Sequence, residues 1–431
     1  MFCFYRYQFK KKKQNTYIFG INLKNLEYSN NIIGAMSENK ERRVYIDYNA
    51  TTPLRQEVKE AMQHSMDLFG NASSLHASGR SAHTQIEQAR TMVENLLGAQ
   101  PHTVYFTSGG SESNNTVFQT MRQLACAPDG SPLKEGRCEF ITSAIEHPCV
   151  FNSAKYMQSL GFKVSFLPVD EYGKISISAL KNALSEKTLL VSIMTANNEI
   201  GTIQDIPAIS SLVKDSGAWM HTDATQAIGK IPVNAGNLGV DYLTASAHKI
   251  YGPKGIGALY VKKGSPLYPL IHGGHQEDGL RAGTYNNLGI IGFGKAAEIA
   301  AQELAHYGNE ISVLRNRLRD GMAAAVPNIK INGHPTDILP NTLNISFPGA
   351  EGEAILLSMD MAGIEASTGS ACASGSLDPS PVLMAIGLGP ELAHGSIRFS
   401  LGWGISVDDI DYIIKTVPPI ISRLRAMSSV T

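Results

Sequence analysis

The sequence predicts an α/β fold with a mostly parallel sheet covered by helices. Short apolar runs typical of buried strands recur from Val44 onward, and amphipathic segments separate them. The seven expected strands cover residues 104–106, 140–142, 164–167, 189–194, 219–221, 242–244 and 258–261. The amphipathic segments include 112–124, 178–184 and 206–214. Sheets of this kind carry their chemistry in loops beyond the strand ends, so functional residues are expected there.

The pattern changes after about residue 305, which predicts a second, smaller α+β domain. Its expected elements are a helix at 303–325, a strand at 342–347, a helix at 353–361 and a strand at 397–401. Ser406 and Asp409 resemble a capping box that starts the last helix, which Pro418 and Pro419 should kink or interrupt. The expected large domain spans residues 59–304, and the small domain combines 44–58 with 305–431.

Composition is that of an ordinary globular enzyme, with 43% hydrophobic and 17% charged residues among 431. The net charge of −1 gives no reason to expect direct nucleic-acid binding, and no apolar run is long enough to span a membrane. The five scattered cysteines contain no CxxC pair, so neither a disulfide framework nor a metal site is expected. A reducing, cytoplasmic location fits best.

Residues 1–36 differ from the rest, because they are aromatic and basic with a single acid, Glu27. We expect a disordered tail, or a start codon placed too early with Met36 as the true start. An organellar targeting segment ranks below both, since such segments are usually richer in Arg and Ser.

Lys249 follows a predicted strand, in the glycine-rich segment SAHKIYGPKG (246–255). A lysine amine held there could form a Schiff base, although most lysines beside glycine are solvated surface residues. Asp223 also follows a strand and should be largely buried, where it needs a partner; the commoner alternative is an Asp that bonds backbone amides in a turn. The segment TSGGSESNN (107–115) could cradle an anion at a helix start, or be a plain turn.

Each of these three signals is ambiguous alone, but together they match the three handles of pyridoxal phosphate (PLP): its aldehyde, its ring nitrogen and its phosphate. The chain then resembles the cysteine desulfurases of the NifS/IscS type, group I, within the class V aminotransferase family of fold-type I PLP enzymes. The matching segments are 45–53, 70–80, 107–115, 145–148, 197–201, 223–226, 246–255, 281–284, 367–380 and 396–402.

The resemblance implies a role for each matching residue. Lys249 would hold PLP as a Schiff base, Asp223 would pair with the ring nitrogen, and Gln226 would bond the phenolic oxygen. His147 would stack on the ring and help to move protons. The residues expected to bind the phosphate are Gly110, Ser111, Ser246 and His248.

The substrate would also be held by residues of the matching segments. Asn198 would contact the cofactor and, with Arg398, hold the substrate carboxylate, which a guanidinium fork fits well. Thr284 would reach the phosphate of a neighbouring subunit's cofactor, which implies a homodimer.

Cys372 lies in a run of small residues between Gly369 and Gly375, where we expect a mobile loop. An isolated cysteine is more often an inert core residue. The resemblance instead makes Cys372 the thiolate that attacks the sulfur of L-cysteine, leaving a persulfide and L-alanine. Cys3, Cys126, Cys138 and Cys149 are interpreted as structural.

Some questions stay open from the sequence. The sulfur could go to an iron–sulfur scaffold protein, to tRNA thiolation or to cofactor synthesis. A selenocysteine lyase, a cysteine-sulfinate desulfinase and a silent scaffold are lower-ranked alternatives. His275 and Asp278 depart from the family pattern, which has glycine and arginine there, and His275 could perturb its turn.

Overall fold

The computed structural model describes residues 42–127, 130–133, 135–368 and 379–427. It divides into two units, one up to Arg43 and one from Val44 to the C-terminus. In the first unit only Arg42 and Arg43 are described, and both are exposed and outside any helix or strand. The expected N-terminal extension and the Cys372 loop lie outside the described residues.

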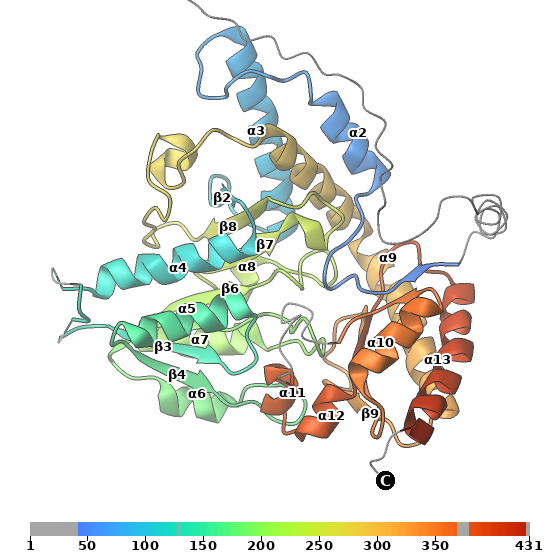
Figure 1. The fold of residues 1–431 in the computed structure, drawn as a ribbon. Helices are drawn as coiled ribbons and strands as arrows, with labels where there is room; N and C mark the ends of the chain where they lie inside the picture. Colours follow the sequence, from blue (N-terminus) through green and yellow to red (C-terminus); the bar gives the residue numbers. More distant parts are fainter. Residues whose placement is uncertain (1–41, 128–129, 134, 369–378, 428–431) are drawn as a thin grey trace, which may run out of the picture. The chain divides into compact units, whose positions relative to one another are not determined.

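A seven-stranded sheet forms the centre of the second unit (Figure 1). Its strands are β2 (Val104–Thr107), β3 (Glu139–Ser143), β4 (Lys163–Leu167), β5 (Thr188–Ser192), β6 (Trp219–Asp223), β7 (Tyr242–Ser246) and β8 (Gly257–Val261). Their order is β2-β8-β7-β6-β5-β3-β4, with β8 antiparallel to both neighbours and every other pair parallel. All seven predicted strands and the α/β class are therefore confirmed.

Helices cover both faces of this sheet, because successive strand residues point to opposite sides. Phe140 and Tyr242 face a core shared with α4 and α5, whereas Ile141 and Leu243 face a core shared with α3, α7 and α9 (Asn287–Ala325). The helices that precede and separate these strands are α3 (Ala77–Leu97), α4 (Gly110–Ala125), α5 (Pro148–Ser159), α6 (Ile177–Ala183), α7 (Ile206–Ser216) and α8 (Ala235–Leu238).

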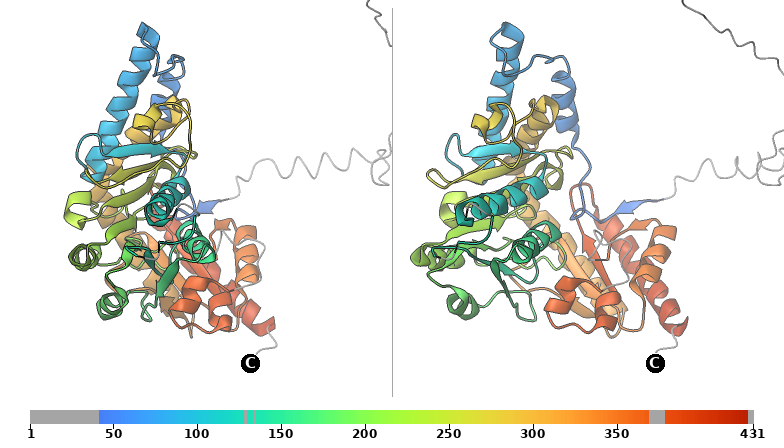
Figure 2. Two further views of the ribbon diagram at one scale, coloured as in Figure 1. Left: turned by 90° about the vertical axis from the view of Figure 1, so that its left-hand side faces the viewer. Right: turned by 60° about the vertical axis from the view of Figure 1, so that its left-hand side comes forward.

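A second core gathers the C-terminal elements with the segment around Val44–Tyr48. Its strands are β9 (Lys330–Asn332), β10 (Thr342–Ser346) and β12 (Ser396–Ser400) in one antiparallel sheet, and β1 (Val44–Tyr45) beside β11 (Ile364–Glu365). The remaining helices are α2 (Gln56–His64), α9 (Asn287–Ala325), α10 (Gly352–Met361), α11 (Pro381–Ala385), α12 (Pro390–His394) and α13 (Val407–Met427). Both views of Figure 2 place β1, in blue, next to the orange and red C-terminal elements.

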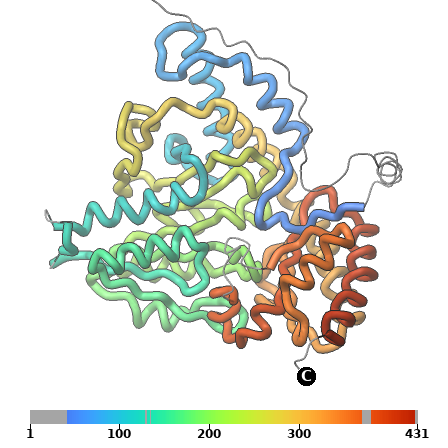
Figure 3. Tube along the Cα trace, in the orientation of Figure 1, coloured from blue at the N-terminus to red at the C-terminus, as the bar shows by residue number. Residues whose placement is uncertain are grey.

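The structure differs from two expectations about helices. Helix α9 begins at Asn287, well before the predicted start at Glu303, and can be followed as one tan rod in Figure 3. Helix α13 runs through Pro418 and Pro419 without interruption. Tertiary packing prevails over the local cost of proline there, since Val417, Ile420 and Ile421 on this helix are buried in the second core.

The capping box at the start of α13 is confirmed, because Asp409 N donates to Ser406 Oγ (3.2 Å) and Ser406 N donates to Asp409 Oδ2 (3.0 Å). We propose that the two cores mark the large and small domains expected from the sequence. The proposed boundaries at residues 58 and 304 fall inside α2 and α9, so these helices would join the domains. Among the described helices, none is long and apolar enough to cross a membrane.

Candidate active site

Predicted site residues gather at one edge of the large sheet. Asp223 ends β6 and Ser246 ends β7, and a 3-10 turn, η2 (Ala247–Lys249), follows at once. His147 comes shortly after β3 and caps α5. Because β3, β6 and β7 are parallel members of one sheet, their carboxyl ends lie at the same edge. The strand-end positions predicted from the sequence are confirmed.

Asp223 is buried, with 6% of its surface exposed. Its Oδ2 accepts a hydrogen bond from Asn114 Nδ2 (2.7 Å), and its Oδ1 accepts one from Thr225 N (2.9 Å). A buried carboxylate held by two neutral donors suits a protonated ring nitrogen as its counterion. The geometry thus fits the role expected for Asp223.

The turn before α4 is open where an anion would sit. At Gly109, whose φ is 156°, an added Cβ would meet no atom within 4 Å. At Gly110 an added Cβ would lie 3.1 Å from Thr225 Oγ1 and 3.9 Å from Ser246 Cβ. Thr225 Oγ1 is buried and has no hydrogen-bond partner among the described residues. A phosphate at this helix N-terminus would satisfy that hydroxyl, so the segment fits the predicted phosphate seat.

Two other residues predicted to bind phosphate lie differently. Ser111 is exposed in the first turn of α4. His248 Nδ1 lies 3.2 Å from Thr51 Oγ1. Burial and the nearby charges of Lys249 and Lys254 lower the pKa of His248 to about 4, so its ring is neutral at physiological pH. His248 could therefore contact a phosphate through a neutral N–H but not as a cation.

Lys249 is held by the segment that joins β1 to α2. Its Nζ donates to the backbone carbonyls of Asn49 (2.5 Å) and Ala50 (2.8 Å). Gln226 Nε2 donates to the same Asn49 carbonyl (2.9 Å). Lys249, the predicted Schiff-base residue, and Gln226, the predicted partner of the phenolic oxygen, thus share one acceptor, the Asn49 carbonyl.

Lys230 is a buried residue of this network that the sequence reasoning missed. Its Nζ donates to Gln226 Oε1 (2.7 Å) and to Asn49 Oδ1 (3.0 Å). Burial lowers the pKa of Lys230 well below its usual value, and the charges of Lys249 and Arg398 lower it further. Lys230 thus fixes the orientation of the Gln226 amide, so that a ligand could be met only by the second hydrogen of Nε2.

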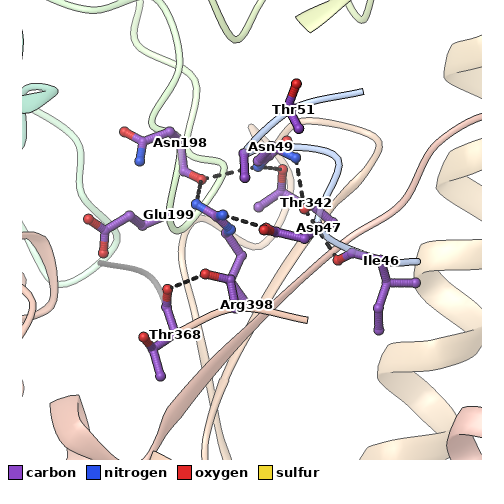
Figure 4. Close-up of polar contacts among 12 residues, drawn as sticks. Ile46, Asp47, Asn49, Thr51, Asn198, Glu199, Thr342, Thr368 and Arg398 are labelled. Atoms are coloured by element: carbon purple, nitrogen blue, oxygen red, sulfur yellow. Dashed lines mark hydrogen bonds and ion pairs between the residues drawn. The ribbon is translucent and has the colours of Figure 1, made fainter. Parts of the chain in front are cut away.

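Arg398 lies on β12 with 2% of its surface exposed. Its Nη2 donates to Asp47 Oδ1 (2.6 Å), and its Nη1 donates to the backbone carbonyl of Asn198 (3.1 Å). Figure 4 shows the Asn198 side-chain amide pointing away from the guanidinium. Arg398 Nε is buried without a hydrogen-bond partner among the described residues. The guanidinium therefore keeps a donor for an incoming carboxylate, as the substrate-binding prediction requires.

Asn49 forms hydrogen bonds with several residues of the candidate site. Its Nδ2 donates to Thr342 Oγ1 (2.8 Å) and to the Asn198 carbonyl (3.1 Å), so it links β10 to the segment that contacts Arg398 (Figure 4). Only 1% of its surface is exposed. Asn49 lies in the segment 45–53 that carried the family resemblance, but no role was predicted for it. Neither Asn49 nor Asp47 could be assigned from an isolated sequence segment, because their partners come from distant strands.

Both ends of the segment that contains Cys372 are anchored beside Asn198 and Arg398. Before the gap, Arg398 N donates to Ser367 O (2.7 Å). After the gap, Ser380 Oγ donates to Glu199 Oε2 (2.5 Å), and Ser380 also caps α11. Cys372 itself is outside the described residues.

His147 is half-buried, and one of its ring nitrogens contacts Cys149 in the first turn of α5. Its Nδ1 lies 2.9 Å from Cys149 Sγ and accepts from Cys149 N (3.3 Å). Burial lowers the pKa of His147, partly offset by Asp223 and reinforced by Lys249. Cys149 was interpreted as structural, but it lies against a predicted site residue.

Thr284 is exposed between a 3-10 turn, η3 (Gln276–Gly279), and α9. That exposure suits a residue that acts on another subunit. The expected perturbation at His275 is absent, since its φ of −88° needs no glycine. Asp278 has a φ of 57°, a left-handed conformation that Asp tolerates better than most residues.

The residues fit PLP at its three handles. An amine, a buried carboxylate and an open helix N-terminus with an unpaired hydroxyl, Thr225 Oγ1, lie along one edge of the sheet. Within the described ranges, no three His, Cys, Asp or Glu side chains come together as a metal ion would require.

Comparison with known proteins gives a consistent result. A family model described as class-V aminotransferase matches residues 44–413. The cysteine desulfurase IscS of Dictyoglomus turgidum is 46% identical over 389 residues, which cover 90% of this chain and 97% of that protein. The IscS of Methanosarcina thermophila is 44% identical over 402 residues, covering 93% of this chain and 97% of that protein.

Solved structures agree with these relatives. A NifS-like protein superposes with a TM-score of 0.82 at 38% identity, covering 88% of this chain and 100% of that one. SspA in complex with cysteine gives a TM-score of 0.73 at 34% identity, covering 83% of this chain and 98% of that one. The resemblance and the fold predicted from the sequence motifs are confirmed.

Proposed function

The chain belongs to the class-V aminotransferase family and, within it, to the PLP-dependent cysteine desulfurases, and from that premise we propose that Cys372 accepts the sulfur. The observation that carries this proposal is the anchoring of the Cys372 segment beside Arg398 and Glu199. Cys372 is five residues beyond Ser367, so it can lie at most about 18 Å from that anchor.

In this proposal the substrate carboxylate binds Arg398, whose guanidinium Asp47 and the Asn198 carbonyl already orient. The substrate amine takes the place of Lys249 Nζ, which then removes the proton from Cα. PLP, when bound, supplies the electron sink that stabilises the resulting negative charge. Asp223 keeps the ring nitrogen protonated by its negative charge, and the α4 N-terminus with Thr225 holds the phosphate.

The sulfur then moves to the protein. The Cys372 thiolate attacks the substrate sulfur, so an S–S bond forms while the Cβ–S bond breaks. The electron pair of that bond stays with carbon, which takes a proton and leaves as L-alanine. Attack requires the thiolate, so the local pKa and the position of the loop set the rate of this step.

The partners are part of the proposal. A second copy of the chain would complete each site with Thr284, which is exposed. The persulfide would pass to an iron–sulfur scaffold protein or another sulfur acceptor. A cytoplasmic location is proposed from the composition of the chain alone.

The test compares the purified wild type with Cys372→Ala, loaded with PLP and supplied with L-cysteine and a reductant. Both proteins should be yellow, because Cys372 does not hold the cofactor. The wild type should release sulfide and alanine in equal amounts, while Cys372→Ala should release little of either. A mass-labelled thiol assay should place the persulfide on Cys372.

Cys138→Ala is the matched control, since Cys138 is a part-buried cysteine in the strand core away from the site. It should keep wild-type turnover. Full activity of Cys372→Ala would refute the acceptor role and favour direct elimination of sulfur.

A further inference from the structure

His147 has one ring nitrogen whose role is fixed by the backbone. Cys149 N donates to His147 Nδ1 at 3.3 Å, and a backbone N–H can only donate. Nδ1 must therefore present its lone pair. Because burial favours the neutral ring, the single ring proton belongs on Nε2.

The thiol of Cys149 makes a second contact with the same nitrogen. Cys149 Sγ lies 2.9 Å from His147 Nδ1 and 3.0 Å from Asn114 Nδ2. Since Asn114 Nδ2 is a donor, the sulfur accepts from it and is left with its own S–H to donate. That S–H points to the lone pair of Nδ1, so the thiol holds the ring as a donor.

The orientation of Asn114 follows from Asp223. Asn114 Nδ2 lies 2.7 Å from Asp223 Oδ2, and the reversed amide would place its oxygen against a carboxylate. The two hydrogens of Nδ2 match two acceptors, one on Asp223 and one on Cys149. In the series Asp223–Asn114–Cys149–His147, each hydrogen bond thus has an assigned donor and an assigned acceptor.

We propose that Cys149 is a positioning residue whose thiol, through Asn114, couples the carboxylate of Asp223 to His147 and, together with its backbone N–H, keeps His147 Nδ1 unprotonated. The inference deepens the proposed function and rests on its placement of His147 and Asp223 at the cofactor. It makes His147 an N–H donor toward the site at the start of the reaction, not a base. A cysteine that merely filled space would show no such set of directed contacts.

The protonation state of Cys149 supports this role. Burial raises the pKa of the Cys149 thiol to about 12, and the charge of Asp223 contributes. The thiol therefore keeps its hydrogen at neutral pH and is no rival to Cys372 as a nucleophile. Two charged groups, Asp223 and Lys249, also act on the His147 ring. Both act through their charge, whereas the thiol contacts Nδ1 directly.

The test measures the ring nitrogens of His147 by ¹⁵N NMR in PLP-loaded protein without substrate, assigned by a His147→Gln variant. In the wild type we expect a neutral ring with the proton on Nε2. Cys149→Ala should raise the pKa of His147, because Nδ1 loses the thiol donor, while the retained backbone N–H of residue 149 keeps the proton on Nε2. Cys149→Ser, which keeps an O–H donor, should restore the wild-type signals.

Kinetics give a second measurement. Cys149→Ala should lower kcat about fivefold, the size expected for one lost neutral hydrogen bond, and leave KM unchanged. Cys126→Ala is the control, because the Cys126 thiol donates to the Gly130 carbonyl at the far end of α4. It should alter neither the His147 signals nor kcat.

Three results would overturn the inference: a wild-type neutral ring protonated on Nδ1, unchanged His147 signals in Cys149→Ala, or failure of Cys149→Ser to restore them. If Cys149→Ala does not fold, the wild-type and Cys149→Ser spectra still show which ring nitrogen of His147 carries the proton and whether a hydroxyl donor preserves it. Because the NMR experiment uses no substrate, its outcome is independent of whether Cys372 is the sulfur acceptor.

Discussion

Lys230 is a buried amine that serves two acceptors, Gln226 Oε1 and Asn49 Oδ1. Lys230→Met removes both donated hydrogen bonds and leaves the two acceptors buried. We expect the free energy of unfolding to fall by about 1–3 kcal/mol for each acceptor, measured by urea denaturation of the PLP-loaded protein. Lys214→Met, on the exposed side of α7, should leave it unchanged. Equal stability of Lys230→Met and wild type would contradict the assigned hydrogen bonds.

Glu146 is a buried carboxyl beside His147. Its Oε1 accepts from Ser143 Oγ (2.6 Å) and Met194 N (3.0 Å), and burial raises its pKa from 4.5 to about 8. Below pH 4.5 the folded and unfolded states are both protonated. Between about pH 4.5 and 8 only the unfolded state loses the proton, so the free energy of unfolding should fall as pH rises.

Glu146→Gln removes the titrating group and should flatten this decline, which is at most about 1.4 kcal/mol per pH unit for one group. The measurement is urea denaturation at several pH values between 5 and 8. Glu171→Gln, an exposed carboxylate, should keep the wild-type slope. A slope in Glu146→Gln as steep as in the wild type would show that Glu146 does not titrate in this range.

At the scale of residues, the sequence was informative where chemistry follows a strand end. Asp223 and Lys249 were predicted because each follows an apolar run. Cys149 and Lys230 were not, because nothing local distinguishes them from structural residues. Their importance comes from partners such as Asn114 and Asn49, which only tertiary folding brings near.

At the scale of elements, helix α11 matters because its cap holds one end of the Cys372 segment. Ser380 Oγ accepts from Leu383 N (3.2 Å) and donates to Glu199 Oε2 (2.5 Å). Ser380→Ala removes both bonds, and loss of a helix cap alone costs about 0.5–2 kcal/mol. We expect slower persulfide formation on Cys372 with an unchanged KM for cysteine, measured by rapid-quench mass spectrometry.

Ser380→Thr keeps the hydroxyl and should recover most of the rate. Ser176→Ala is the matched control, because Ser176 caps α6 in the same way but contacts no site residue. If Ser380→Ala formed persulfide as fast as the wild type, the anchored end would have no part in sulfur transfer.

The strands of the large sheet were predictable because buried strands read as short apolar runs. The start of α9 was not, since residues 287–302 are rich in glycine, alanine and isoleucine and pack in a core along much of their length. Such a segment lacks the one-sided periodicity that marks a surface helix. The effect of Pro418 and Pro419 was not predictable for a related reason. The rule that proline disrupts a helix interior considers only the local backbone and not tertiary packing.

At the scale of the whole molecule, two large apolar side chains are left exposed between α2 and α3. Phe69 is 87% exposed and Leu75 is 90% exposed. Single exposed apolar residues are common, but two in one connection suit an interface between copies of the chain. The proposed role of Thr284 requires such a second copy, so dimerisation and activity should be lost together.

The double variant Phe69→Arg/Leu75→Arg should sediment as a monomer in analytical ultracentrifugation, while the wild type sediments as a dimer. Its turnover of cysteine should fall more than tenfold, because each site would lack the partner's Thr284. Met361→Arg is the control, since Met361 is 89% exposed on α10 and is assigned to no interface. It should stay dimeric and active. A monomeric double variant with full activity would mean that each chain builds a complete site alone, and Thr284 would then have no role across subunits.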